Sequence, residues 1–225
     1  EQEAWTSRGV AIEVPQYVRE VVEEIAFQAR NERKIDKRSG VSQRMPISAL
    51  EGVVSNAERR ALRLGENEAV PRLGDLYAAL STITGKMELE YEGELQGADR
   101  IAKELVARAA GETFEARAGG ADVESIVEYF EAGGALQVSD DASGEACVKG
   151  FAQVPGLLEL VKSVGLAASS ASAGVRAAAC ELALEALVAE RRISRTDGGY
   201  GRARHPSLGK GGGPGQHQGF DPFGA

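Results

Sequence analysis

Aromatic residues are scarce in this sequence. They make up 5% of the 225 residues, so a buried core must consist mainly of Ala, Val, Leu and Ile. Only two cysteines occur, Cys147 and Cys180; this number excludes a disulfide framework, and their apolar flanks predict reduced, packed thiols. The two histidines, His205 and His217, both lie in a glycine-rich segment without a third ligand nearby, so we expect no metal site.

Long apolar runs and an excess of positive charge are also missing. No segment approaches the roughly 20 apolar residues that span a bilayer, and no signal sequence opens the chain, so we expect a cytoplasmic protein. The chain carries 26 basic and 34 acidic residues, a net charge of −8. This balance argues against a general binder of nucleic acids or membrane surfaces.

A phosphate-binding loop is absent from the sequence as well. Such a loop needs Gly, four residues, Gly-Lys and then Ser or Thr. The two Gly-Lys pairs, at 85–86 and 209–210, have Leu80 and Arg204 in place of the leading glycine, and Met87 and Gly211 follow them. No apolar run ends in the Asp-Glu pair of a magnesium-holding strand either. We therefore expect this chain not to hydrolyse ATP alone.

Hydrophobic periodicity predicts a mostly α-helical protein. Apolar residues recur at helical spacing, and Pro and Gly mark the ends of several segments. We expect helices over residues 15–33, 46–65, 71–83, 99–119, 122–133, 154–164 and 175–192. They group into a helical domain at 1–118 and a smaller helical unit at 119–197. Residues 198–225 are rich in Gly and Pro and have little apolar surface, which predicts a disordered tail.

One short segment has the alternation of a β element instead. Residues 87–92 alternate between Met, Leu or Tyr and glutamate, which predicts a half-buried strand or an extended arm. The outer side of this arm carries Glu88, Glu90 and Glu92. We expect a surface for recognition or solubility there, since three carboxylates along one exposed side do not converge on a cation.

The stretch from residue 34 to residue 60 is the most informative for function. Basic residues gather between Arg30 and Arg44, and Pro46 then opens the second helix. Arg44 lies at the N-terminal end of that helix, after a turn that contains Gly40 and Ser42. A guanidinium is a planar, permanently charged fork of donors that matches phosphate oxygens, so Arg44 is a candidate phosphate ligand.

Residues 34–60 resemble the sensor-2 segment in the helical lid of AAA+ ATPases, in the branch of magnesium-chelatase I-type and MoxR-like proteins. The run Gly-Val-Ser-Gln-Arg at 40–44 is similar to their Gly-Ala-Ser-x-Arg element, with Gln43 in place of the commoner proline. The resemblance extends from about Glu1 to near Arg192. It covers the C-terminal part of such a protein, without the nucleotide-binding core.

This resemblance implies an AAA+ lid-like helical bundle that follows a core holding ATP and Mg²⁺. In that setting Arg44 would contact the γ-phosphate, in the same or a neighbouring subunit, while Gly40 and Ser42 shape the turn. The implied partners are that AAA+ core, further copies in a homo-oligomeric ring and a von Willebrand factor A-domain protein. The implied role is to couple ATP hydrolysis to ring assembly and client remodelling. This chain alone would need no cofactor.

Several alternatives stay open at this point. Arg44 could simply cap a helix or pair with an acid. Lys37 and Arg38 could extend the phosphate-facing field or form a solvated charge run. The chain could also be a non-catalytic helical adaptor. A nucleic-acid-binding domain that uses the Arg30 to Arg44 cluster is the third class, and the acidic net charge counts against it.

Overall fold

A computed structural model describes residues 9–38, 40–139, 141–196 and 198–203. The described residues are mostly helical, as predicted, with a few short strands. In the first half of the chain the elements are β1 (Ala11–Ile12), α1 (Gln16–Asn31), α2 (Met45–Leu64), β2 (Glu68–Ala69), α3 (Leu73–Ala78), α4 (Ser81–Thr84), α5 (Tyr91–Gln96) and α6 (Ala98–Ala118). In the second half they are α7 (Glu124–Glu131), β3 (Leu136–Gln137), α8 (Gly144–Phe151), α9 (Leu157–Ser163), α10 (Ala173–Ala189), β4 (Ile193–Thr196) and β5 (Gly199–Arg202).

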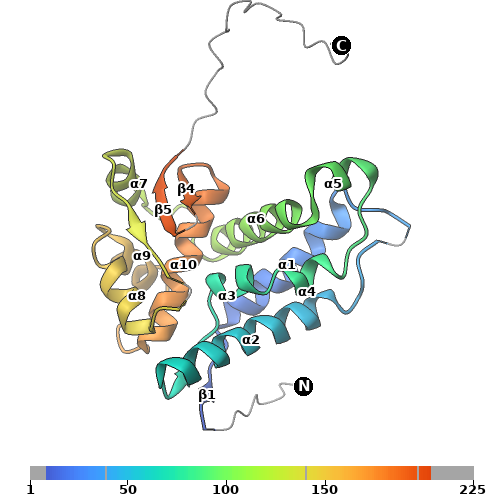
Figure 1. Ribbon diagram of the computed structural model, residues 1–225. Coiled ribbons are helices and arrows are strands. Elements are labelled where there is room, and N and C mark those ends of the chain that lie inside the picture. The colour runs from blue at the N-terminus through green and yellow to red at the C-terminus, as the bar shows by residue number, and fades with distance from the viewer. Residues whose placement is uncertain (1–8, 39, 140, 197, 204–225) are drawn as a thin grey trace, which may run out of the picture.

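The three long helices α1, α2 and α6 form the body of the first half (Figure 1). The predicted apolar stripe of α1 is buried along its whole length, because its members lie three and four residues apart on one face. In α2 the helical spacing of apolar residues predicts a buried stripe that includes Ile47, but Ile47 is 59% exposed. The start of α2 falls at Met45, beside Pro46, and Gly65 ends it in the left-handed conformation at φ 68°. These boundaries agree with the sequence prediction to within a residue or two.

The segment that precedes α5 is extended, but it is shorter than the predicted arm. Leu89 pairs with Ile35 and Met87 pairs with Val41 in isolated antiparallel bridges. At Tyr91 the chain turns into α5, so the expectation of an extended arm running on through Glu92 is wrong. The alternation of apolar residues and glutamates does not show where the extended segment ends, because the first turn of a helix also places neighbouring residues on different sides.

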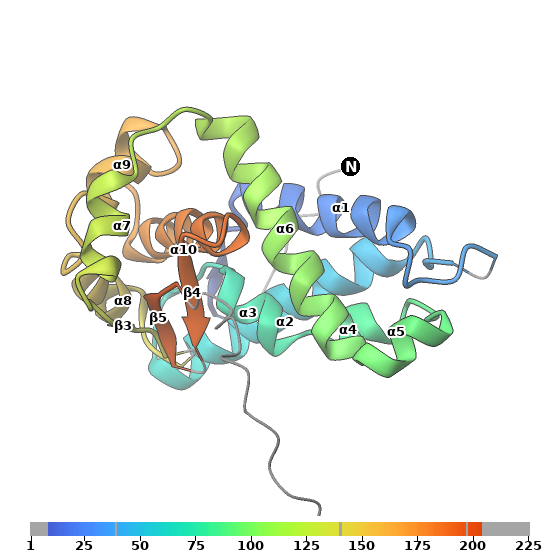
Figure 2. The same cartoon turned by 90° about the horizontal axis from the view of Figure 1, so that it is seen from above.

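Helix α10 forms the centre of the second half. It packs against α6, α8 and α9, and its side chains are buried all round, which explains its nearly continuous Ala and Leu sequence. A three-stranded antiparallel sheet of order β3-β5-β4 contacts α10 through β4; β3 precedes α10 in the chain, and β4 and β5 follow it. Figure 2 shows α6 between α1 on one side and α10 on the other, with α7, α8 and α9 at the outer edge.

Two parts of the second half differ from the sequence prediction. Helix α8 was not expected, although Ser143 caps it by accepting a hydrogen bond from the Ala146 amide at 3.2 Å. The tail predicted from residue 198 is wrong for its first residues, because β5 is ordered and Tyr200 is only 2% exposed. The rest of that prediction, at 204–225, lies outside the described residues, as do His205 and His217.

The buried side chains form one main cluster that runs from Tyr17 to Tyr200. This cluster continues across the expected domain boundary at residue 119, because α6 packs against α10. The Tyr17 hydroxyl also donates a hydrogen bond to the Val175 carbonyl at 3.2 Å. Both cysteines are buried free thiols in this cluster. The site residues of the first half are therefore held by a core to which both halves contribute.

Candidate functional site

Arg44 lies at the N-cap of α2 with an exposed side chain. Its backbone is fixed at both ends: the amide donates to Ser42 Oγ at 3.2 Å, and the carbonyl accepts from the Ser48 amide at 2.9 Å. The guanidinium has no hydrogen bond or ion pair with any described residue. Its donors are therefore available to an external anion, which is what a phosphate-sensing arginine requires.

The turn that precedes Arg44 is tied to the 86–88 segment. The Ser42 amide donates to the Lys86 carbonyl at 2.9 Å, and the Gly40 carbonyl accepts from the Glu88 amide at 3.4 Å. Gly40 has φ 63°, a left-handed conformation that glycine adopts at little cost. The fully buried Met45 anchors the other end of the turn. Arg44 thus extends from a backbone that is already ordered, which lowers the entropy cost of binding.

The two further candidates differ from Arg44. Lys37 is exposed, but its Nζ donates to the Arg30 carbonyl at 2.9 Å, in the last turn of α1. A cation favours that end of a helix, so the structure supports a capping role for Lys37. Arg38 is exposed as well, and its amide donates to Asp36. None of the five predicted residues lines one of the three main cavities between described residues.

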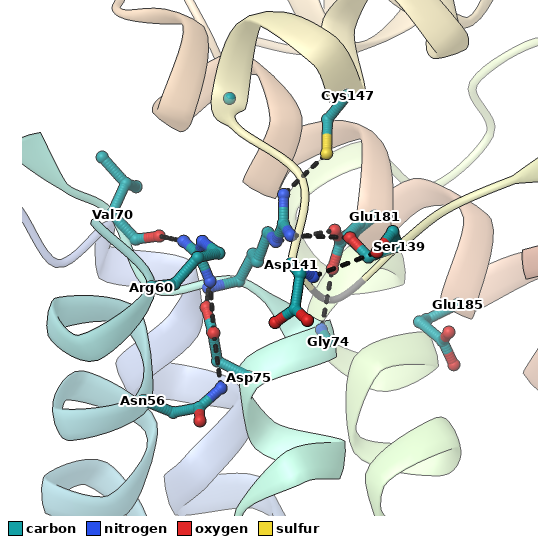
Figure 3. Close-up of polar contacts among 12 residues, drawn as sticks. Asn56, Arg60, Val70, Gly74, Asp75, Ser139, Asp141, Cys147, Glu181 and Glu185 are labelled. Carbon is teal, nitrogen blue, oxygen red and sulfur yellow. Dashed lines mark hydrogen bonds and ion pairs between the residues drawn. The ribbon is translucent and has the colours of Figure 1, made fainter. Parts of the chain in front are cut away.

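The structure also contains a buried charge cluster that the sequence analysis missed (Figure 3). Its centre is Arg72, which is 2% exposed and lies just before α3. The Nε atom lies 3.3 Å from an oxygen of Glu181, Nη2 donates to the Ser139 carbonyl at 3.1 Å, and Nη1 lies 2.6 Å from Cys147 Sγ. Glu181 also accepts from the Gly74 amide at 2.7 Å. One guanidinium thus connects α3, α8 and α10.

A second buried pair extends this cluster. Arg60, 6% exposed, pairs with Asp75 and donates to the Val70 carbonyl at 2.8 Å. Asp75 also accepts from the Arg72 amide at 3.0 Å and from Asn56 Nδ2 at 2.8 Å. Since every one of these charges has an opposite partner, the cluster can be stable inside the core.

The pKa shifts in this cluster indicate a structural role. Burial raises the pKa of the Glu181 carboxyl, and Arg72 opposes that effect. Burial likewise raises the pKa of the Cys147 thiol, although the neighbouring Arg72 partly counteracts it. A thiol that stays protonated is a poor nucleophile. The cluster therefore holds elements together rather than offering a reactive group.

A related network lies on the next turn of α10. Glu185, fully buried, accepts from the Tyr77 hydroxyl and from the Tyr200 hydroxyl, each at 2.7 Å, and pairs with Arg195. The Arg195 guanidinium also lies over the Tyr77 ring, 4.0 Å from its centroid. Glu181 and Glu185 were visible in the sequence as two acids inside an apolar helix, and that signal could have revealed buried partners.

Arg195 forms part of the wall of an open cleft of about 940 Å³ between α3, α6, the end of α10 and the β4–β5 hairpin. Its charged lining is predominantly basic. The lining cations are Lys34, Arg100, Lys103, Arg108, Arg191 and Arg195, and the lining carboxylates are Glu32 and Glu104. On a chain of net charge −8, this concentration of positive charge is local.

Comparison with known proteins gives no assignment: no family model, curated protein or solved structure matches this chain significantly. Among the described residues no group of three or more His, Cys, Asp or Glu could hold a metal ion. No helix in the described ranges is long and apolar enough to cross a membrane. The functional assignment therefore depends on the geometry of the residues themselves.

Proposed function

We propose that this chain is the C-terminal lid and extension of an AAA+ ATPase of the magnesium-chelatase-like and MoxR-like branch. In this proposal a separate AAA+ core binds ATP and Mg²⁺, in the same or a neighbouring subunit. Arg44 contacts the γ-phosphate, and the helical body transmits the state of the nucleotide to ring assembly and to remodelling of a client. A von Willebrand factor A-domain protein is the proposed partner in that pathway.

The exposed, unpaired guanidinium of Arg44 is the observation that carries the proposal. Eight arginines in the described residues form ion pairs, whereas the guanidinium of Arg44, like those of Arg33 and Arg191, forms none. Arg44 instead stands at the start of a 20-residue helix on a turn fixed by backbone hydrogen bonds. A cation that is already ordered can stabilise the charge that develops on a transferred phosphoryl group, because no free energy is lost in reorganising it during the reaction.

Charged side chains of both signs lie around the Arg44 turn. Arg33, Lys37 and Arg38 are exposed on the loop that leads into it, and Glu88 is exposed on the segment that is hydrogen-bonded to it. The same loop offers no glycine-rich cradle for the other phosphates. Arg44 therefore suits a residue that reports on one phosphate of a nucleotide bound elsewhere.

Nucleotide binding tests this proposal. In isothermal titration the isolated chain should bind Mg-ATP no more tightly than the millimolar range, because a single arginine contact supplies only a few kcal/mol. When the chain is joined to its AAA+ core, Arg44→Ala should weaken binding of a non-hydrolysable ATP analogue and leave ADP binding unchanged. Equal losses for ATP and ADP, or no loss for either, would contradict the γ-phosphate role and favour the non-catalytic adaptor.

A further inference from the structure

The surface of α5 combines exposed apolar side chains with exposed carboxylates. Tyr91 and Leu95 are each 73% exposed, and they lie four residues apart on one face of the helix. Four exposed glutamates surround them. We call this surface the acidic ridge; it consists of Glu88, Glu90, Tyr91, Glu92, Glu94 and Leu95.

The acidic ridge is held in place by the loop that follows α1. The Glu90 amide donates to the Lys34 carbonyl at 2.9 Å, and Gln96 Nε2 donates to Glu104 Oε1 at 2.8 Å. Gly93 allows this close approach, since a Cβ at that position would lie 2.4 Å from the Lys34 carbonyl oxygen. The exposure of Tyr91 and Leu95 is thus a property of an ordered helix. Exposed apolar area of this kind is typical of a contact surface.

The basic cleft described above offers the complementary chemistry. Two of its cations, Lys103 on α6 and Arg191 after α10, have no ion pair with any described residue. They come from different elements, so a negatively charged segment in the cleft meets positive charge from both. Ala107, Val188 and Ala189 also line the cleft. The cleft therefore suits an occupant that carries both carboxylates and apolar side chains.

A nucleotide fits the basic cleft less well than a protein segment. The aromatic ring that lines it, Tyr77, is covered on one face by the Arg195 guanidinium, and its hydroxyl is engaged by Glu185. A base would have to displace that cation to stack there. The volume of about 940 Å³ also accommodates several side chains of an acidic helix.

We propose that the acidic ridge of one copy of this chain docks into the basic cleft of a second copy. The ridge supplies carboxylates together with Tyr91 and Leu95, and the cleft supplies cations together with apolar side chains. Helix α5 is attached at Lys34, on the rim of the cleft, and no ridge residue lines the cleft of its own chain. The contact provides a subunit interface for the ring in the proposed function, but it requires neither nucleotide nor Arg44.

Charge-reversal variants test the two surfaces of the contact one at a time. Glu92→Lys/Glu94→Lys cancels the negative charge of the ridge by reversing the two glutamates within α5, and Lys103→Glu/Arg191→Glu cancels the positive charge of the cleft by reversing its two cations without an ion pair among described residues. These four side chains are exposed and have no ion pair among described residues, so both variants should fold. Glu23→Lys/Glu51→Lys, on exposed faces of α1 and α2, is the control with the same charge change as the ridge variant.

Sedimentation at low ionic strength, over roughly ten to several hundred micromolar, measures the association expected of a small interface. The wild-type chain and the control should self-associate, and each reversed variant alone should be monomeric. An equimolar mixture of the two reversed variants should associate again, because the unaltered ridge of the cleft variant then meets the unaltered cleft of the ridge variant. A rise in salt should weaken all of these contacts.

Three results would overturn the proposal: a wild-type chain that is monomeric throughout, reversed variants that associate like the wild type, or a mixture that stays monomeric. A test without charge change is Tyr91→Ser/Leu95→Ser, which should keep the thermal stability and lose association; retained association would also refute the contact. Arg44→Ala should associate like the wild type. A failure of this interface is therefore distinguishable from a failure of the nucleotide role.

Discussion

Removal of Glu181 should destabilise the fold severely, because it leaves a buried guanidinium without its counter-charge. Arg72 and Glu181 are 2% and 1% exposed, and their closest atoms lie 3.3 Å apart. Breaking a buried pair from one side costs about 3 to 5 kcal/mol, and the Gly74 amide also loses its acceptor at a cost of about 1 to 3 kcal/mol. A typical domain has only about 5 to 15 kcal/mol of stability in total. Glu181→Leu should therefore unfold at a much lower urea concentration.

A double-mutant cycle distinguishes lost charge pairing from lost packing. Arg72→Met/Glu181→Leu removes both charges and keeps apolar volume, so it should recover most of the roughly 3 to 5 kcal/mol that Glu181→Leu alone loses by leaving a buried charge unpaired. Urea denaturation followed by circular dichroism gives each free energy of unfolding. If Glu181→Leu costs less than about 1 kcal/mol, or if the two single effects simply add, the cluster does not hold the halves together as we infer.

Three further predictions follow from other contacts. Arg117 donates to both oxygens of Glu20 at 2.6 Å and holds the pKa of that carboxyl below its usual range. The stabilisation is then present above the ordinary carboxyl pKa and lost as pH falls through the lowered one, so Glu20→Gln should cost up to about 1 kcal/mol in urea titrations at pH 7 and almost nothing near pH 2. Gly93→Ala should lower the melting temperature despite alanine's helix preference, because its Cβ meets the Lys34 carbonyl; a stabilised variant would contradict the close approach. In fluorescence anisotropy, random DNA should bind weakly at low salt and not near physiological salt; salt-resistant binding would favour the nucleic-acid alternative.

The helices of the first half were predictable because their signals are local. The α1 stripe repeats at three and four residues, Pro46 lies at the start of α2, and Gly65 ends it, so short-range sterics and one buried face decide these boundaries. The Arg44 turn belongs to the same category, since Gly40 and the helix start lie within a few residues. Ile47 has the spacing of a buried residue but is exposed, because apolar periodicity does not show at which end a helix extends beyond the core.

The elements that prediction missed depend on contacts between distant residues. Strand β5 looks like a flexible linker in sequence because Gly199 and Gly201 flank a single apolar residue, Tyr200. That residue is buried only because α10 brings Glu185 to its hydroxyl and β3 pairs beside it. The Arg72 cluster is hidden in the same way, since its carboxylate comes from α10. No local pattern specifies which buried arginine and glutamate will meet.

ATP turnover of the chain assembled with its AAA+ core tests the central claim most directly. Arg44→Ala should reduce turnover by about tenfold or more, since arginines at phosphoryl-transfer sites contribute orders of magnitude in rate. Arg44→Lys should restore only part of it, because an ammonium lacks the fork of donors. Arg33→Ala, an exposed neighbour with the same change in charge, should match the parent, and all three variants should keep the parent's circular dichroism and melting temperature within a few degrees. Full turnover in Arg44→Ala would show that this arginine only begins a helix and that the proposed phosphate contact does not exist.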